Sequence, residues 1–325
     1  MLPDKLSTLI RGYQNSRVLL TAVELDLFRA VTSPASAAEV ASRLGTDPRA
    51  TEMLLNALVA LECLTKSGEL FRATEETARY FGTDSPDNER LATMHSVHQW
   101  DSWSTLTECV RAGYSVTAGE PRRDAAWTEA FIAAMNRNAA SRAPHVVRAV
   151  GGTGVRRMLD VGGGPATYSI AFARAFPKLR ADVLDKPEVL PIARRHIEDA
   201  GLGNRITARA GDLTSSLFGE GYNLILLSNI CHMLSPEQNK DLLRRCFNAL
   251  APGGRVVLQD FILDENRTSP ATAAVFALNM LVATREGNNY SESDYAGWFR
   301  EMGFQEGRRV ELPGPTDLMV ATRLA

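Results

Sequence analysis

Residues 158–177 read MLDVGGGPATYSIAFARAFP, in which a short apolar stretch is followed by three consecutive glycines and then by apolar residues at helical spacing. The stretch predicts a β-strand that delivers Asp160, a tight turn at the glycines and a helix that begins near Ala166. Glycines lack a β-carbon, so a ligand can lie against such a turn, and ligands bind at the carboxyl ends of strands in open α/β sheets. The stretch therefore predicts a ligand site in an α/β fold.

The chain from residue 156 onward alternates between strand-like and helix-like segments, which is typical of a parallel sheet covered on both faces. Ser235 and Gln238 are spaced as a capping box, with Pro236 at the first helical position. The final VELPGPTDLMVATRL predicts an antiparallel hairpin around Pro-Gly-Pro. The predicted strands are RRMLDV (156–161), RADVLD (180–185), RITARAGDL (205–213), YNLILLSN (222–229) and GRVVLQDFIL (254–263).

Residues 1–90 have a different pattern, which predicts a helix, a turn at GTDP, a second helix and two short strands around Ser67-Gly68. This outline is that of a winged-helix domain, so DNA binding is one interpretation. The second helix, near residues 48–62, carries Arg49 against Glu52 and Glu62 and is otherwise mostly apolar. Because it lacks the basic and amide side chains of a groove-reading helix, we favour dimerisation or core packing over DNA binding.

The composition narrows the class of protein and of partner. With 325 residues, 45% hydrophobic residues and a net charge of -2, the chain is typical of a globular protein that has no electrostatic preference for nucleic acid or anionic membranes. No window has the length of apolar residues that a membrane span needs, so we expect a cytoplasmic protein. The four cysteines form no CxxC pair, which argues against a disulfide scaffold and a thiolate metal site.

We therefore predict three parts: a winged-helix-like dimerisation domain (1–90), a helical connector (91–150) and a ligand-binding α/β domain (151–325). The connector holds three of the four tryptophans, Trp100, Trp103 and Trp127. Aromatic side chains in a bridging segment pack in a core or interface, and such a segment also commonly walls a ligand cleft.

The details of the glycine turn disfavour a nicotinamide or flavin cofactor, because the dinucleotide fingerprint requires glycine where this chain has Thr167. Asp185 ends the next predicted strand, at the distance expected for a carboxylate that binds ribose hydroxyls. Asp212, in AGDL, ends the third, where an acid can accept from an adenine amino group while Leu213 packs on the ring. Each acid could instead be a helix cap, but three acids at successive strand ends favour a nucleoside ligand.

These motifs, with LLSNICHMLSPEQ, APGGRVVLQDFIL and ALNMLVATREGNNYSESDYAGWFREMGF, resemble the class I S-adenosylmethionine-dependent O-methyltransferases of the caffeate and acetylserotonin methyltransferase group. The resemblance covers nearly the whole chain. It implies a Rossmann-like seven-stranded sheet, S-adenosylmethionine as the methyl donor, no metal and a homodimer formed through the amino-terminal domain. It also implies a small aromatic molecule as the methyl acceptor, but not which one.

The resemblance also implies a set of site residues. Ser228 stands where many plant members have a lysine, so a hydroxyl contact replaces a charged one there. The expected cofactor residues are Asp160, Gly162, Gly163, Gly164, Asp185, Lys186, Gly211, Asp212, Leu213, Ser228 and Asn229, and the expected acceptor residues are Trp127, Phe131, Met135, Phe276, Asn279 and Met280, for which core packing is an equal alternative.

His232, in SNICHML, lies where this group keeps a general base. Methyl transfer to a hydroxyl requires alignment and removal of a proton, and a neutral imidazole can accept one at neutral pH. Asp260 and Asn289 stand where relatives have acids beside the histidine, so Asp260 is the expected orienter, whereas Asn289 can contribute a hydrogen bond but no charge. Met233 replaces an aspartate common in relatives. The alternatives are carbon or nitrogen methylation, a cofactor-binding homologue that transfers no methyl group, and a DNA-binding regulator.

Overall fold

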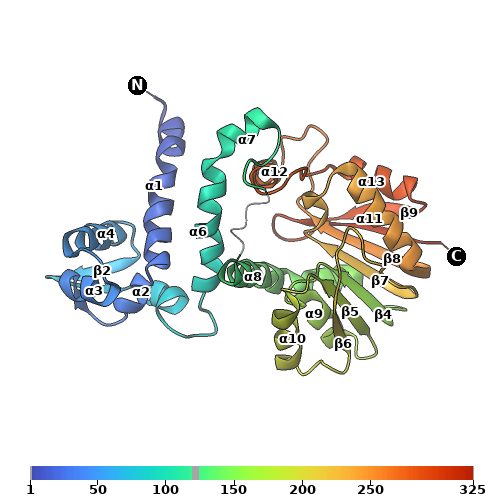
Figure 1. Cartoon of the computed structure of the whole chain (residues 1–325), viewed down its shortest axis with the longest axis horizontal. Coiled ribbons are helices and arrows are strands. Elements are labelled where there is room, and N and C mark those ends of the chain that lie inside the picture. The colour runs from blue at the N-terminus through green and yellow to red at the C-terminus, as the bar shows by residue number, and fades with distance from the viewer. Residues whose placement is uncertain (1, 119–123, 325) are drawn as a thin grey trace. The chain divides into compact units, whose positions relative to one another are not determined.

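The computed structural model describes residues 2–118 and 124–324, apart from the side chain of Glu306. Residues 119–123, which belong to the predicted connector 91–150, lie outside the described residues. The chain divides into two compact units, Met1–Trp100 and Asp101–Ala325, and each is described separately. Figure 1 shows the elements of both units in chain order.

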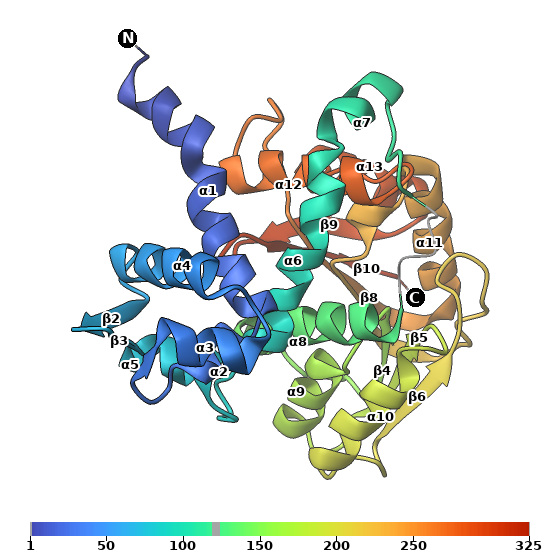
Figure 2. The same cartoon turned by 60° about the vertical axis from the view of Figure 1, so that its left-hand side comes forward.

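The first unit contains the predicted helix pair and wing. Its elements are α1 (Asp4–Glu24), α2 (Leu27–Ala30), β1 (Ala35–Ser36), α3 (Ala37–Leu44), α4 (Pro48–Ala60), β2 (Leu64–Ser67), β3 (Leu70–Ala73), α5 (Glu75–Thr77) and the π-helix η1 (Ala78–Gly82). The small sheet has the order β1-β3-β2 and is antiparallel. Figure 2 shows α3 and α4 side by side with the β2–β3 hairpin at one end of the pair.

The hairpin turn lies one residue later than predicted, at Gly68-Glu69, because Ser67 still pairs with Leu70. Gly68 takes a φ of 58°, in the left-handed region that glycine enters without steric cost. A buried cluster that includes Phe28, Leu55 and Leu58 forms the core of this unit. The apolar face of α4 is thus used inside the unit, as the interpretation of core packing requires.

Three helices follow: α6 (Arg90–Ser104), which crosses the boundary between the units, α7 (Leu106–Ala112) and α8 (Ala125–Val150). Within the described part of 91–150, residues 105, 113–118 and 124 lie outside these helices. The later elements are β4 (Arg157–Val161), α9 (Thr167–Ala175), β5 (Arg180–Asp185), α10 (Leu190–Asp199), β6 (Ile206–Ala210), β7 (Tyr222–Ser228), the 3-10 turn η2 (Cys231–Met233), α11 (Pro236–Ala249), β8 (Leu250–Asp260), α12 (Ala271–Ala283), α13 (Glu292–Glu301), β9 (Gln305–Val310) and β10 (Asp317–Thr322).

The second unit is built on a seven-stranded sheet in the order β6-β5-β4-β7-β8-β10-β9. The first five strands of this order are parallel, and β10 is antiparallel to both β8 and β9, which confirms the predicted final hairpin. The strand order reverses between β4 and β7, where ligands bind in doubly wound sheets.

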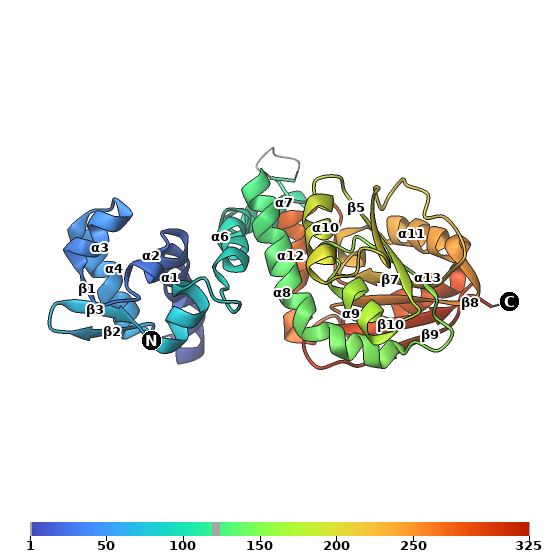
Figure 3. The same ribbon diagram turned by 90° about the horizontal axis from the view of Figure 1, so that it is seen from below.

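Helices cover both faces of this sheet, and alternate side chains of each strand supply the two cores. On one face, Leu159 and Ile225 pack in a cluster with residues of α11 and α13. On the other, Met158 and Leu224 pack with residues of α8, α9 and α10. Figure 3 shows the strands enclosed between these two layers. The predicted sheet, covered on both faces, is confirmed.

The segment that carries His232 is fixed at the start of α11. Ser235 and Gln238 form the predicted capping box, with Pro236 in the first helical turn. Asn239 is fully buried and its amide donates to the carbonyl oxygens of Cys231 and Leu234, at 2.9 and 3.2 Å. These contacts hold η2 in one conformation just beyond the end of β7.

Candidate active site

The glycine turn joins β4 to α9 and has little room for side chains. Gly162 and Gly164 have φ values of 66° and 53°, so both lie in the left-handed region. A β-carbon at Gly163 would lie 2.8 Å from both Asp160 Cγ and Val183 Cγ1, which is too close for any real side chain. A side chain at Gly163 would therefore clash with β4 and β5 themselves, so this position of the turn requires glycine.

Asp185, the last residue of β5, hydrogen-bonds to this turn. The Gly164 N–H donates to Asp185 Oδ2 and the Lys186 N–H donates to Oδ1, both at 2.7 Å. Burial raises the pKa of this carboxyl, while these two backbone donors lower it. The structure thus brings Asp185 and Lys186 beside the glycine turn at the carboxyl edge of the sheet.

Asp160 is buried beneath the same turn. The Ser169 hydroxyl donates to its Oδ2 at 2.8 Å, whereas Oδ1 is buried without a hydrogen-bond partner. Burial raises the pKa of Asp160 to about 7, and the charge of Asp185 adds to the increase. An unpaired buried oxygen at this position is available to a donor on a ligand.

Asp212 lies two residues beyond β6 and is exposed. Its Oδ1 accepts from the Thr214 N–H at 2.6 Å and from the Thr214 hydroxyl, which lower the pKa of this carboxyl. Gly211 is tied to the end of β5, since its N–H donates to the Asp185 carbonyl at 2.9 Å. Leu213 is half-buried against the core on the α11 side. Asp212 therefore caps its own turn, and its second oxygen remains open.

Ser228 is the last residue of β7 and Asn229 follows it, next to the point where the strand order reverses. The Ser228 hydroxyl donates to Gln259 Oε1 at 3.1 Å and accepts from Asn229 Nδ2 at 3.2 Å. Asn229 has a φ of 56°, and its buried Oδ1 has no partner. The hydroxyl of Ser228 is thus engaged within the protein, and the free acceptor at this position belongs to Asn229.

His232 and Asp260 form a buried pair. His232 Nδ1 lies 2.6 Å from Asp260 Oδ1, and the His232 N–H donates to Oδ2 at 3.1 Å. The two side chains are 6% and 1% exposed. A carboxylate that accepts from Nδ1–H fixes the neutral tautomer, which leaves Nε2 as the proton acceptor.

Two aromatic rings surround the imidazole. Phe276 meets it edge-on at 5.0 Å between ring centroids, and Phe261 lies at 6.4 Å. The two phenyl rings stack on each other at 3.9 Å. Because Phe276 comes from α12, this contact places one of the predicted acceptor residues next to the predicted base.

Asn289 is buried, but its side-chain amide donates to α12 and not to the His232 ring. Its Nδ2 donates to the Ala273 carbonyl of α12 at 2.5 Å, and its Oδ1 has no partner. In the described structure it makes no hydrogen bond with the His232 ring, although the neighbouring Asn288 N–H donates to the His232 carbonyl at 2.9 Å. The contact seen for Asn289 supports α12 and not the imidazole.

The other predicted acceptor residues lie on α8 and α12. Trp127 and Phe131 stack at 5.2 Å between centroids. Trp103 Nε1 donates to Asn279 Oδ1 at 3.0 Å. Met280 is buried and Met135 is half-buried. Phe276 is the predicted acceptor residue whose ring meets the His232 ring.

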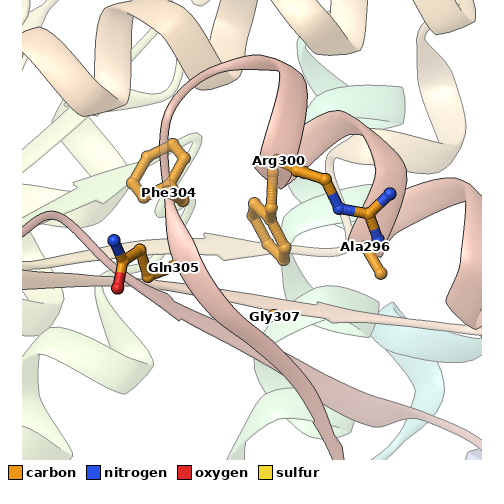
Figure 4. A pocket seen from close by; sticks show the side chains of 6 residues that line it. Ala296, Arg300, Phe304, Gln305 and Gly307 are labelled. Carbon is orange, nitrogen blue, oxygen red and sulfur yellow. The ribbon is translucent and has the colours of Figure 1, made fainter.

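A cavity of about 390 Å³ lies away from the predicted site residues. Figure 4 shows it between α13 and β9, and its lining consists of Ala296, Phe299, Arg300, Phe304, Gln305 and Gly307. None of the predicted site residues lines it.

Within residues 2–118 and 124–324, no cluster of three or more histidine, cysteine or acidic side chains could hold a metal ion. No helix in that same part of the chain has the length and apolar character of a membrane span.

Two residues of the site were not predicted from the sequence. The Phe261 N–H donates to Asp260 Oδ1 at 2.9 Å, and the Tyr295 hydroxyl donates to Asp260 Oδ2 at 3.2 Å. Phe261 could have been found because it directly follows Asp260. Tyr295 gives no such signal, since it belongs to a helix 35 positions further along the chain.

Comparisons with known proteins identify the family. The profile of the O-methyltransferase domain matches residues 103–305, and that of the O-methyltransferase dimerisation domain matches residues 7–84. The 3-hydroxy-5-methyl-1-naphthoate 3-O-methyltransferase of Streptomyces sahachiroi is 32% identical over 96% of this chain and 92% of its own. The chain therefore belongs to the O-methyltransferase family and is an S-adenosylmethionine-dependent O-methyltransferase.

Two further relatives bear on the fold and the chemistry. The solved structure of PigF with S-adenosylhomocysteine has a TM-score of 0.92 and 27% identity, and covers 99% of this chain and 100% of PigF. The L-tyrosine C(3)-methyltransferase of Streptomyces lavendulae is 27% identical over 98% of this chain and 93% of its own. These comparisons confirm the predicted fold class and S-adenosylmethionine as the cofactor.

Proposed function

We propose that the protein methylates a hydroxyl group on a small aromatic or enolic metabolite, with His232 as the general base and Asp260 as its orienter. The observation that carries the proposal is the His232 Nδ1 to Asp260 Oδ1 contact of 2.6 Å, at the carboxyl edge of the sheet. The 3-hydroxy-5-methyl-1-naphthoate 3-O-methyltransferase, whose name gives an aromatic acceptor, is 32% identical to the chain and supports this acceptor class.

The residues at the glycine turn fit the methyl donor. The unpaired Oδ1 atoms of Asp160 and Asn229 are suited to accept from an amino group. Asp185 lies where ribose hydroxyls would bind, and Asp212 keeps one oxygen for the adenine edge. S-adenosylmethionine supplies an electrophilic methyl group on a sulfonium, so the protein contributes alignment and removal of a proton.

His232 is suited to remove that proton. Its Nδ1 is committed to Asp260, so Nε2 accepts, and the buried carboxylate stabilises the imidazolium that forms. Phe261 and Phe276 exclude water from the ring and provide flat surfaces against which an aromatic acceptor can align. On this proposal Trp127, Phe131, Met135, Asn279 and Met280 form further acceptor contacts.

Replacement of His232 tests the proposal. His232→Ala should lower turnover by roughly two to four orders of magnitude while S-adenosylmethionine binding, measured by calorimetry, stays within about twofold. His196→Ala is the matched control, because His196 is a half-buried histidine on α10 that has no contact with Asp260. Near-normal turnover of His232→Ala would rule out His232 as the general base.

Carbon methylation is a second candidate, favoured by the likeness to the L-tyrosine C(3)-methyltransferase. An activated aromatic carbon ortho to a hydroxyl also requires deprotonation of that hydroxyl, so the same base would serve. The position of the methyl group on the product distinguishes the two reactions.

We also propose that the chain forms a homodimer through its first unit, which contains the matched dimerisation domain. The amino-terminal part of α1 exposes a row of apolar side chains on one face: Leu6, Leu9, Ile10 and Tyr13, each between 46% and 68% exposed. A second copy of this face would cover it.

A further inference from the structure

We propose that Tyr295 is a positioning residue for methyl transfer: its hydroxyl holds the Asp260 carboxylate and, through it, the orientation and tautomer of the His232 ring. This inference rests on the proposed function, in which His232 is the base. Tyr295 lies on α13, and its hydroxyl donates to Asp260 Oδ2 at 3.2 Å.

Asp260 accepts from four donors, two on each oxygen. Oδ1 takes His232 Nδ1–H at 2.6 Å and the Phe261 N–H at 2.9 Å. Oδ2 takes the His232 N–H at 3.1 Å and the Tyr295 hydroxyl. Three donors therefore come from η2 and from the end of β8, and Tyr295 supplies the only side-chain donor from a separate element among these four. The tyrosine thus ties the carboxylate to α13, an element other than the imidazole's own segment.

The environment of Tyr295 keeps its hydroxyl a donor. The side chain is fully buried and packs edge-on against Tyr290 at 5.9 Å and Trp298 at 5.3 Å between centroids. Burial, and then the charge of Asp260, raise the pKa of Tyr295 well above its usual range. The proton therefore stays on the oxygen, and the packed ring cannot rotate the hydroxyl away.

The other titratable groups that face Asp260 are Cys231 of η2 and Tyr290, which precedes α13. Burial is the main cause that raises the pKa of each, and the Asp260 charge contributes to both. Both groups stay protonated around neutral pH, so neither adds a titration to that of the pair. Neither Cys231 nor Tyr290 therefore contributes to the pH dependence of turnover around neutral pH.

Tyr295→Phe tests the inference, because it removes only the hydroxyl oxygen. With one donor fewer, the anionic carboxylate is less stabilised and the pair holds its proton more tightly. We expect the midpoint of the acidic limb of kcat against pH to rise by about one pH unit, and kcat at neutral pH to fall about three- to tenfold. KM should change by less than about twofold, because Tyr295 touches no substrate.

Tyr290→Phe is the matched control. It removes a buried hydroxyl from the adjacent ring, but that hydroxyl donates to the Leu234 carbonyl and not to Asp260. The midpoint should not move in this variant, whatever its thermal stability. An unchanged midpoint in Tyr295→Phe, or an equal shift in both variants, would overturn the inference.

Histidine-ring nitrogen NMR separates this inference from the proposed function. The chain has five histidines, so the His232 signals are those lost in His232→Ala. We expect the titration midpoint of these signals to rise in Tyr295→Phe even if His232→Ala remains active. If His232→Ala is inactive but Tyr295→Phe leaves the signals unchanged, Tyr295 has no positioning role, while His232 is still the general base.

Discussion

At the scale of single residues, the site combines buried acids whose environments differ. Asp260 has four hydrogen-bond donors, whereas Asp160 has one donor and one unpaired oxygen. A fully paired carboxylate serves to orient its neighbours, and a partly paired one costs stability until a ligand arrives. On the proposed function, Asp260 orients the base and Asp160 contacts the ligand at the same edge of the sheet.

Asp160→Asn should show the cost of the partly paired acid as a function of pH. The folded-state pKa of Asp160 is raised from 3.8 to about 7, so between these values the folded chain binds the proton more tightly than the unfolded one. The contribution of Asp160 to stability is therefore fully present below the unfolded-state pKa of 3.8. It is lost as pH rises through the folded-state pKa of about 7. In the absence of cofactor, the free energy of unfolding of the wild type relative to Asp160→Asn should fall by up to about 4 kcal/mol across this window.

Denaturant unfolding at a series of pH values measures that difference. A difference that stays constant with pH would mean that Asp160 is not held protonated by burial. Calorimetry on the same variant should show weaker binding of S-adenosylmethionine, since an amide cannot stabilise a positive charge.

Sequence reasoning at this scale predicted that Asp260 orients His232, and the structure pairs the two side chains at 2.6 Å, but it did not predict the other donors around the carboxylate. Periodicity and strand ends locate a residue along the chain, and parallel strands bring their carboxyl ends to one edge. They do not show which hydrogen bonds form. Asn289 was expected beside the imidazole and instead donates to Ala273, while Tyr295 gave no signal because its contact depends on how α13 packs.

At the scale of elements, the turn between β4 and α9 is the most constrained feature of the site. Gly163→Ala should be destabilising by about 1–3 kcal/mol, because its β-carbon would crowd Asp160 and Val183. It should also weaken S-adenosylmethionine binding at least about tenfold, as the backbone shifts away from the ligand. Urea unfolding and calorimetry check the two effects.

Gly203→Ala provides the control for that variant. A β-carbon at Gly203 meets nothing within 4 Å, and its φ is not in the left-handed region. Equal effects of the two substitutions would show that the close approach at Gly163 carries no special cost. The turn itself was predictable from three glycines after a strand, but which glycine is the most restricted depends on the side chains of β4 and β5.

At the scale of the whole molecule, the two units were predictable because their periodicities differ: helix, turn, helix and hairpin in the first, alternating strands and helices in the second. The three-part division at residues 90 and 150 stays a prediction. Trp103 of α6 donates to Asn279 of α12, so part of the predicted connector belongs to the second unit. Side-chain contacts of this kind decide unit boundaries and are not visible in local sequence patterns.

The dimer is testable through α1. Leu9→Glu places a charge in the exposed apolar row, where Leu9 is 68% exposed, and should convert the dimer to a monomer at micromolar concentration. Light scattering after size-exclusion chromatography measures the mass in solution. Thr8→Glu adds the same charge on the opposite side of the helix and should leave the dimer intact. A Leu9→Glu protein that remains a dimer would place the interface elsewhere.

The central claim is that this O-methyltransferase transfers the methyl group to a hydroxyl oxygen that His232 deprotonates. The most direct measurement uses S-adenosylmethionine with an isotopically labelled methyl group and a panel of hydroxylated aromatic compounds, with NMR of the product to locate the label. The account predicts a labelled O-methyl ether whose formation falls by roughly two to four orders of magnitude in His232→Ala. A label on carbon or nitrogen, or an ether formed equally well by His232→Ala, would contradict it.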